Sequence, residues 1–308
     1  MTDRANQRVA YYNGDYLPED EVRIPFRDRS FIFGDGCFDL TRTFNGVPFK
    51  VDAHMERLYR SLAYLRIDTG LSPAQMTEIT LEVLRRNAHL LGDGEDYWLG
   101  QRISRGVFAV GEDAWGHEGS TVIVECMPLP FRQRAPLFRD GITVIVPSVR
   151  RSPPDALSPR AKTHSYLNLI LADMEARAQK PDAWAVLLDM NGNLCEGMGS
   201  NIFLVKDGRL RTPRERYVLP GISRQTVIEL AGELGVEVEE ADLDLYDAAI
   251  ADEAFVTSTS LCICPVSSIG GAQIGGGKVP GPVTKRLLNA YSELVGCDIA
   301  GQYLRHLE

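Results

Sequence analysis

Four Asn-Gly or Asp-Gly pairs, each next to a short apolar run, most constrain what this chain can fold into. Such pairs favour two-residue turns with positive φ, and the twist of these turns matches that of two antiparallel strands. Each pair therefore predicts a β-hairpin. The turns are expected at residues 13–14, 45–46, 191–192 and 207–208, after or between strand-like runs at 9–12, 41–44, 184–188 and 201–205. The sheets should be largely antiparallel.

Segments with helical spacing lie between these hairpins. Ser72, Pro73 and Gln75 form an N-cap, a first-turn proline and a capping-box glutamine, which together predict the start of a helix. Apolar spacing of i, i+3, i+4 and i+7 or close variants predicts the others. Helices are expected at 55–62, 73 to about 91, 167–174, 227–234 and 282–294. Strands and helices follow one another without regular βαβ alternation, so the predicted fold class is α+β.

The length of 308 residues is enough for two domains. A strand-like run at 121–125 is followed by a segment with Pro128, Pro130, Arg132 and Arg134, and a new strand is expected at 142–146. We therefore predict a small N-terminal α/β domain over residues 1–127, a linker over 128–136 and a larger domain over 137–308.

Composition excludes several classes of protein. A net charge of −9 argues against a nucleic-acid binder. The N-terminus, residues 1–6, has no apolar signal core, and no apolar run approaches the roughly 18 residues that span a bilayer. We expect a cytoplasmic protein without membrane contact. The six cysteines show no CxxC pair and no His/Cys ligand spacing, which predicts buried thiols and no metal site.

Lys162 is the first candidate for chemistry. Of the six lysines it alone stands where an apolar element with helical spacing (167–174) is expected to begin and to be buried; the others lie at turns or in a C-terminal helical segment. A lysine held against apolar surface loses stabilisation of its charge, and its neutral amine is a nucleophile toward carbonyl groups. The alternative is a solvated lysine that caps a loop.

Three further signals are each ambiguous alone. Glu196 precedes an apolar strand among glycines, Gly221 precedes a helix whose free amides favour a phosphate, and the hydroxyls of 257–260 end a strand. Their structural alternatives are a solvated carboxylate, an ordinary helix start and a chain turn. Together with a reactive lysine, this is the set that pyridoxal phosphate needs: an amine, a carboxylate for the ring nitrogen and donors for the phosphate.

With these residues in place, the sequence resembles the class IV aminotransferases, the fold type IV group of pyridoxal-phosphate enzymes. The group includes branched-chain aminotransferases, D-amino-acid transaminases, (R)-selective amine transaminases and aminodeoxychorismate lyase. The landmarks occur in family order: 33–36 with Phe38, 54–58, Lys162, 196–203, 219–224, and 257–259 ahead of Pro265. The resemblance implies a two-domain fold with a small α/β N-terminal domain and a larger pseudo-barrel C-terminal domain, in a homodimer.

The resemblance also implies a role for each matching residue. Lys162 would be the Schiff-base lysine, Glu196 would pair with the pyridinium nitrogen, and Arg57 would bind the phosphate. Tyr166 would correspond to a tyrosine that contacts the phenolic oxygen of the cofactor, although it lies four residues after the lysine instead of five. The remaining cofactor contacts would come from Leu219, Gly221, Ile222, Ser223, Ser258 and Thr259.

The implied substrate pocket contains two arginines, which favour a carboxylate-bearing substrate. Its members would be Phe33, Phe38, Leu40, Arg42, Arg102, Ser260 and Leu261. For both arginines the alternative is structural pairing with an acidic neighbour such as Asp39. Phe33 and Leu40 replace a tyrosine and a glycine of the branched-chain enzymes.

The implied activity is a ping-pong transfer of an amino group between a branched-chain-like or D-amino acid and a 2-oxo acid. Val110 and Glu112 stand where the D-amino-acid transaminases carry an arginine and a histidine. An (R)-selective amine:pyruvate transaminase and an aminodeoxychorismate lyase are alternatives within the family. A cofactor-binding protein without turnover is the alternative outside the enzymes.

Overall fold

A computed structural model describes residues 7–111 and 116–307. Residues 1–6 and Glu112, on which two of the expectations above rest, lie outside this part. Within it, no helix is both long and apolar enough to cross a membrane.

The chain divides into two compact units. The first comprises Met1–Leu129 and Ala161–Tyr166, and the second comprises Pro130–Arg160 and Leu167–Glu308. Two facts bear on the predicted domains. The change of unit after Leu129 lies within the predicted linker, but most of that linker is the start of helix α4 (Phe131–Asp140). The segment that carries Lys162 belongs to the first unit, although it lies about 30 residues further along the chain.

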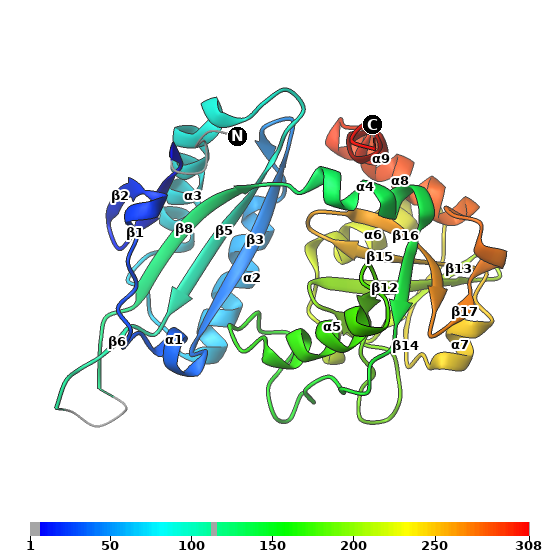
Figure 1. The fold of residues 1–308 in the computed structure, drawn as a ribbon, viewed down its shortest axis with the longest axis horizontal. Coiled ribbons are helices and arrows are strands. Elements are labelled where there is room, and N and C mark those ends of the chain that lie inside the picture. Colours follow the sequence, from blue (N-terminus) through cyan, green and yellow to red (C-terminus); the bar gives the residue numbers. More distant parts are fainter. Residues whose placement is uncertain (1–6, 112–115, 308) are drawn as a thin grey trace. The chain divides into compact units, whose positions relative to one another are not determined.

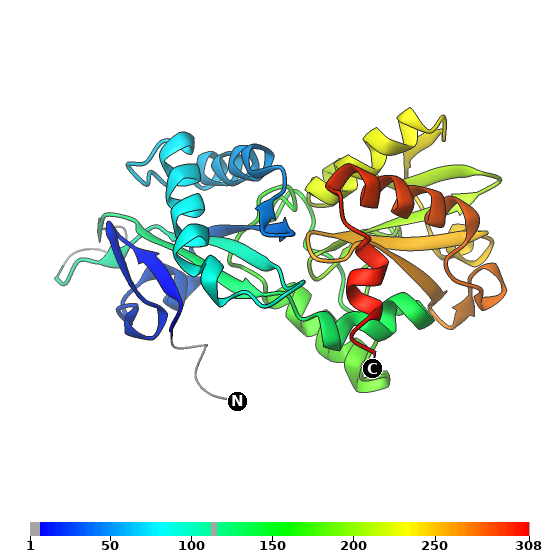
Figure 2. The same ribbon diagram turned by 90° about the horizontal axis from the view of Figure 1, so that it is seen from above.

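The first unit contains a six-stranded antiparallel sheet in its described residues, in the order β2-β1-β8-β5-β3-β4. Its strands are β1 (Val9–Tyr12), β2 (Asp15–Pro18), β3 (Gly36–Phe44), β4 (Val47–Pro48), β5 (Tyr97–Ser104) and β8 (Thr121–Pro128). Helix α2 (Val51–Leu65) packs on β3 and α3 (Pro73–Asn87) packs on β8, on the same face of the sheet (Figure 2). Smaller elements are α1 (Arg29–Phe33), η2 (Glu19–Glu21), η3 (Ala88–Leu90), β6 (Val107–Phe108) and β7 (His117–Glu118).

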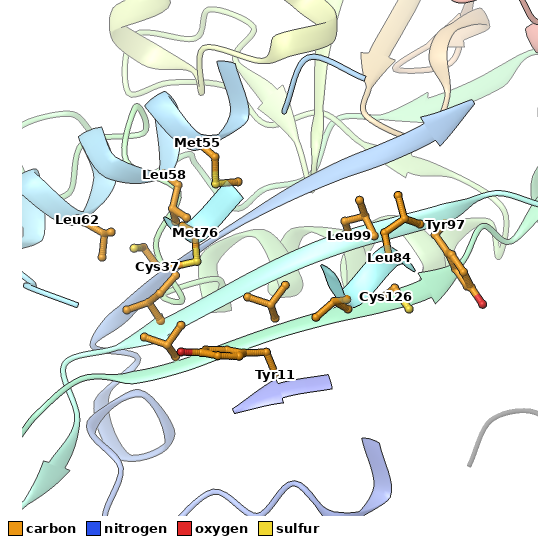
Figure 3. Close-up of a cluster of buried hydrophobic side chains, with 14 of the residues drawn as sticks. Tyr11, Cys37, Met55, Leu58, Leu62, Met76, Leu84, Tyr97, Leu99 and Cys126 are labelled. Atoms are coloured by element: carbon orange, nitrogen blue, oxygen red, sulfur yellow. The ribbon is translucent and has the colours of Figure 1, made fainter. Parts of the chain in front are cut away.

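The core of the first unit lies between the sheet and these two helices. Met55, Leu58 and Leu62 are on one face of α2 and are at most 3% exposed, as their spacing predicts. They meet Cys37 of β3 and Met76 of α3 (Figure 3). Each such side chain contributes about 1.5–3 kcal/mol by leaving water. This packing fixes α2 against β3, the two elements that carry Arg57 and Asp39.

The second unit contains a mixed sheet (Figure 1) whose strands, in the described residues, follow the order β10-β9-β16-β15-β12-β13-β14, with β11 beside β12 and β17 beside β16. The strands are β9 (Ile142–Ile145), β10 (Trp184–Ala185), β11 (Glu196–Gly197), β12 (Ser200–Lys206), β13 (Arg209–Pro213), β14 (Val238–Ala241), β15 (Glu253–Ser258), β16 (Cys262–Ile269) and β17 (Ala272–Gln273). The helices are α4, α5 (Leu167–Gln179), α6 (Ile222–Glu233), α7 (Leu245–Ala249), α8 (Pro282–Val295), α9 (Ile299–Leu304), η4 (Glu215–Tyr217) and η5 (Gly275–Gly277). The predicted α+β class is confirmed.

Three of the four predicted hairpins form as expected. Their turns place Asn13, Asn45 and Asp207 at φ of 47°, 51° and 51°, each followed by a glycine with positive φ. The fourth prediction is only partly right. Strand β10 ends at Ala185 and pairs in parallel with β9. Beyond it, the turn at Gly192 joins two antiparallel arms by an isolated bridge between Leu188 and Leu194 and by backbone hydrogen bonds between Leu187 and residues 195 and 196. The turn and its two arms are as predicted, but the start of the first arm pairs with another strand.

The helix predicted after Lys162 forms, but the prediction of which face is buried is wrong. Helix α5 begins at Leu167, five residues after the lysine, and it buries Leu169, Ala172 and Ala176. The apolar residues predicted to form its core face are 42–66% exposed: Leu167, Ile170, Leu171 and Met174. The face that is buried instead carries one leucine and two alanines. Lys162 is therefore buried by other elements.

Candidate active site

Lys162 lies on an extended segment that runs beside the start of β3. The N–H of Phe38 donates to the carbonyl oxygen of Lys162 (2.9 Å), and the N–H of His164 donates to that of Gly36 (2.8 Å). Gly36 is required here, because a Cβ at this position would overlap the carbonyl of Ile103 and crowd the His164 ring. The N–H of Lys162 donates to the hydroxyl of Ser61 on α2 (3.1 Å). The backbone of the lysine is thus held on both sides.

The side chain of Lys162 is buried among aromatic rings of the first unit. Its Nζ lies 4.6 Å from the ring centroid of Phe38 and 3.4 Å from the hydroxyl of Tyr166. The residue is 8% exposed. Within the described residues of this unit, no carboxylate pairs with the ammonium. An aromatic face and a phenol hold the amine without neutralising it by an ion pair, and Tyr166 lies beside the lysine despite its unusual spacing.

Arg57 forms the centre of a buried polar cluster with Asp39 and His54. Its Nε and Nη2 donate to the two carboxylate oxygens of Asp39, each at 2.8 Å, and His54 Nδ1 lies 2.7 Å from Asp39 Oδ1. Burial opposes ionisation of Asp39, but Arg57 and His54 outweigh it and hold the pKa of that carboxyl well below its usual range. Burial also lowers the pKa of His54. Asp39 was expected to form an ion pair with Arg42 or Arg102, but it forms one with Arg57.

His164 packs on Phe38, the ring that faces the lysine. Its ring stacks on Phe38 at 5.7 Å, and its Nδ1 is 2.5 Å from the hydroxyl of Ser30. Burial, followed by the nearby charge of Arg102, lowers the pKa of His164 to about 4. The ring is therefore neutral near pH 7. Phe38, Arg102, His164 and Tyr166 line a cavity of about 580 Å³ in the first unit.

The two predicted substrate arginines differ in accessibility. Arg42 is 1% exposed, its Nη2 lies 3.6 Å from Asp96, and its guanidinium covers the ring of Phe44. This geometry matches the structural alternative, with Asp96 in place of Asp39, and disfavours a substrate contact. Arg102 donates to Glu125 (2.6 Å), but its side chain is 39% exposed and it lines the cavity.

The apolar positions predicted for the substrate pocket are also divided. Phe38 is 9% exposed and contacts the lysine, and Leu40 is partly buried. Phe33 is 56% exposed, at the end of α1, and packs edge-on against Phe108. Of these three, Phe38 is the one whose ring faces the amine of Lys162.

Glu196 is the central charge of the second unit's site. Its Oε1 accepts from Arg151 Nε (2.9 Å) and its Oε2 accepts from the N–H of Leu219 (2.8 Å). The residue is 4% exposed. It lies in β11, a two-residue strand that pairs with Ser200 and Asn201. Gly197 is needed next to it, because a Cβ would overlap the carbonyl of Ala185.

The segment from Leu219 to Gly221 is held between Glu196 and Asn201. Asn201 Nδ2 donates to the carbonyl of Leu219 (3.0 Å), and Gly221 lies so close to Asn201 that a Cβ would overlap its side-chain oxygen. Gly221 is the N-cap of α6, with no side chain to cap the helix. The first amides of a helix have no intrahelical acceptor and carry its positive dipole end. This start is suited to an anion.

The predicted hydroxyl cluster lies at the end of β15. The hydroxyl of Ser223, in the first turn of α6, donates to the carbonyl of Ser258 (3.0 Å), so this loop is tied to the helix start. Ser258 Oγ accepts from the N–H of Leu261 (3.1 Å), and Ser260 contacts Arg134. Thr259 is partly exposed in the turn, and Leu261 is fully buried.

The comparisons with known proteins agree with this geometry. The family described as Amino-transferase class IV matches residues 36–269. The chain belongs to the class IV aminotransferases. It is 38% identical to a putative branched-chain-amino-acid aminotransferase of Methanocaldococcus jannaschii over 92% of this chain and 95% of the relative. It is 31% identical to the branched-chain-amino-acid aminotransferase of Escherichia coli (strain K12) over 91% of each chain.

Solved structures of this family have the same fold. The branched-chain aminotransferase of Escherichia coli superposes with a TM-score of 0.85 at 31% identity, over 94% of this chain and 95% of that one. Another branched-chain aminotransferase, solved in complex with N-(5'-phosphopyridoxyl)-L-glutamate, superposes with a TM-score of 0.84 at 27% identity, over 95% and 96%. The enzyme of Thermoproteus uzoniensis, solved with norvaline, superposes with a TM-score of 0.83 at 28% identity, over 97% of each chain. This class IV aminotransferase is accordingly an enzyme that depends on pyridoxal phosphate.

The second unit of this aminotransferase fits the cofactor by an observation of its own. The hydroxyls of Ser200 and Thr257 are buried without a hydrogen-bond partner in the described residues, and they lie on the paired strands β12 and β15. Buried polar groups without partners are costly unless a ligand satisfies them. With the anionic Glu196 and the uncapped start of α6, they suit a polar ligand that carries a phosphate.

Sequence reasoning missed the residues that support the site of this aminotransferase. Ser61, Arg151 and Asn201 each contact a predicted site residue, and Asp39 was assigned to other arginines. Asp39 carried a local signal, because it lies next to Phe38, a predicted residue of the substrate pocket. Arg151 and Ser61 carry no local signal, because their partners are 45 and 101 residues away in sequence.

Proposed function

We propose that this aminotransferase transfers the amino group of a branched-chain L-amino acid to a 2-oxo acid. The observation that carries the proposal is the cavity in the first unit. Its lining combines the rings of Phe26, Phe31 and Phe38 with the side chains of Ile24 and Ile123, which suits an aliphatic side chain. The relatives named as branched-chain aminotransferases support the same substrate class.

Lys162 has the central chemical role in the proposal. Its amine would hold the cofactor, and when free it would move a proton from the substrate α-carbon as general base and then general acid. When bound, pyridoxal phosphate supplies the electron sink for that proton transfer. The Phe38 and Tyr166 contacts keep the amine oriented and shielded from water.

The remaining roles are those that the resemblance to the family implies. Glu196 would stabilise the protonated ring nitrogen, and Tyr166 would contact the phenolic oxygen. The phosphate would be bound by Arg57, the amides of Ile222 and Ser223, and Thr259, while Gly221 and Ser258 would shape that site and Leu219 would pack on the ring. Arg102 is the arginine proposed to receive a substrate carboxylate, because its side chain is 39% exposed and lines the cavity.

A half-reaction screen tests the substrate. The yellow enzyme is mixed separately with L-leucine, D-alanine, D-glutamate and (R)-1-phenylethylamine, and the loss of the cofactor's visible absorbance is followed. L-leucine should bleach the enzyme fastest. Faster bleaching by D-alanine or D-glutamate would make it a D-amino-acid transaminase, and by the aromatic amine an (R)-amine transaminase. Bleaching by none of the four would overturn the substrate class.

We also propose a homodimer, in which the exposed face of α5 contacts a second copy. Leu167, Ile170, Leu171 and Met174 lie together on this helix and are 42–66% exposed. Grouped exposed apolar side chains of this kind mark interfaces. Light scattering should give twice the chain mass, and Leu171→Glu should shift it toward the monomer. Tyr246→Glu, at a residue 70% exposed on α7, is the control and should leave the mass unchanged.

The cytoplasm is the proposed location. All six cysteines are free thiols, and five of them are buried. Free thiols are typical of reducing compartments. Fractionation of the source cells, with the enzyme followed by activity, tests this: recovery in a membrane or secreted fraction would contradict it.

A further inference from the structure

The strongest unassigned feature is a closed circuit of hydrogen bonds between β3, α2 and the Lys162 segment. Phe38 of β3 donates to the Lys162 carbonyl (2.9 Å), and the Lys162 amide donates to Ser61 (3.1 Å). The Ser61 hydroxyl donates to the carbonyl of Arg57 (3.1 Å). Arg57 returns to β3 through its two bonds to Asp39 (2.8 Å each). Asp39 is the residue next to Phe38, so the circuit closes.

Asp39 is the only carboxylate in this circuit, and its surroundings hold it firmly. It is 0% exposed, its Oδ1 accepts from the N–H of Leu40 (2.7 Å), and His54 contacts the same oxygen (2.7 Å). Arg57 is engaged through Nε and one terminal nitrogen in a fork that fixes the plane of the guanidinium. A bidentate pair of this kind fixes the orientation of the Arg57 guanidinium as well as balancing its charge.

We propose that Asp39 is a positioning residue that aims Arg57 at the phosphate of the cofactor. The inference rests on the phosphate-binding role proposed above for Arg57. Through Ser61, the same circuit couples the placement of the arginine to the backbone of Lys162. The two cofactor contacts supplied by the first unit are thereby set as one rigid group, before any ligand binds.

The competing explanation is that Asp39 only neutralises a buried arginine. The two explanations differ in what the loss of Asp39 does to phosphate recognition. A neutralising carboxylate affects folding, and any loss of affinity is then the same for pyridoxal phosphate and for pyridoxal, which lacks the phosphate. A positioning carboxylate affects the preference for pyridoxal phosphate over pyridoxal.

The experiment measures that preference on the full chain. Apoenzyme is titrated with pyridoxal phosphate and with pyridoxal. The readout is the preference ratio, which is the Kd for pyridoxal divided by the Kd for pyridoxal phosphate. Asp39→Asn should lower the ratio by about 10- to 100-fold, the effect of losing one charge-assisted contact. Asp39→Glu should restore most of it. Arg57→Ala sets the full loss, and Asp39→Asn combined with Arg57→Ala should lose no more than Arg57→Ala alone.

Asp96→Asn is the matched control, because Asp96 is also fully buried in the first unit and pairs with Arg42. It should leave the ratio unchanged. Ser61→Ala should weaken the binding of both compounds equally, because Ser61 contacts only the backbones of Arg57 and Lys162 and leaves the side-chain fork with Asp39 intact. An unchanged ratio in Asp39→Asn, or an equal fall in Asp96→Asn, would overturn the inference.

Two outcomes separate this inference from the proposed function. A wild-type chain that binds neither compound would overturn the function itself. A wild type that prefers pyridoxal phosphate, with Asp39→Asn retaining the preference, overturns only the positioning role. If Asp39→Asn does not fold, His54→Leu takes its place, since it removes one contact to Asp39 Oδ1. Its ratio should fall severalfold, and an unchanged ratio overturns the inference.

Discussion

The two units differ in the partners that surround their central charged residues, Lys162 and Glu196. In the first unit, Lys162 faces the ring of Phe38 and the hydroxyl of Tyr166, and within that unit's described residues no carboxylate pairs with it. In the second unit, both oxygens of Glu196 are occupied, one by Arg151 and one by the amide of Leu219. In the proposed function Lys162 is a nucleophile that must be free to move, whereas Glu196 is a carboxylate that must stay charged and in place beside a ring nitrogen. The difference in their partners fits these two proposed roles.

The largest expected effect comes from removing the nucleophile. Lys162→Ala should lower the transamination rate by at least about 10³-fold, because both the covalent anchor and the proton carrier are lost. The rate with L-leucine and 2-oxoglutarate is the measurement. Lys180→Ala, which removes a bond to Thr143 in the second unit, should keep the wild-type rate. Turnover in Lys162→Ala would end the assignment of that residue.

The next largest effect is expected from breaking the ion pair of Glu196 with Arg151. Arg151→Leu leaves Glu196 buried without its cation, which should cost about 3–5 kcal/mol of unfolding free energy. The side chains of Arg151 and Glu196 are only 12% and 5% exposed, so solvent cannot replace the pair. Urea unfolding measures the loss. Arg214→Leu breaks a half-exposed pair with Asp242 and should cost less than about 1 kcal/mol. Equal losses would contradict the comparison.

A smaller effect concerns the neutral histidine beside the lysine. The pKa of His164 is about 4 in the folded chain, below its ordinary value of 6.5, so the unfolded chain binds more protons between these values. The contribution of His164 to the free energy of unfolding is therefore full above pH 6.5. It falls by up to about 3 kcal/mol as the pH drops to 4. In His164→Gln this part of the acid loss should disappear. Urea midpoints at pH 4.5 and 7.5 provide the check, and an identical pH dependence in both proteins would refute it.

The smallest effect concerns the start of α6. Gly221→Ala should cost about 1–3 kcal/mol, because the new Cβ overlaps Asn201, which holds Leu219 beside Glu196. Gly232→Ala in the same helix meets no atom within 4 Å and should stabilise the chain by about 0.5–1 kcal/mol. Thermal unfolding distinguishes the two variants. A neutral Gly221→Ala would show that the Leu219 segment adapts easily.

Elements with local signals were predictable from sequence. The capping box at Ser72 and Gln75 forms as expected, and three of four turns form their hairpins. At the fourth turn only part of the predicted strand joins the hairpin, and Trp184 and Ala185 pair with β9 instead, because the choice of strand partner depends on the whole sheet. The apolar face of α5 was assigned to the core because apolar spacing alone cannot tell a buried helix face from an exposed one.

The sequence by itself determined the chemistry available to this aminotransferase: the lysine, the carboxylate, the glycine-led helix start and the α+β class. Only the tertiary structure decided how charges are paired. Arg57 pairs with Asp39, Arg42 with Asp96 and Glu196 with Arg151, over separations of 18, 54 and 45 residues. An ion pair depends on distances of a few ångströms, and the packing of α2 on β3 and the pairing of strands set those distances. These distances cannot be read from the residue identities along the chain.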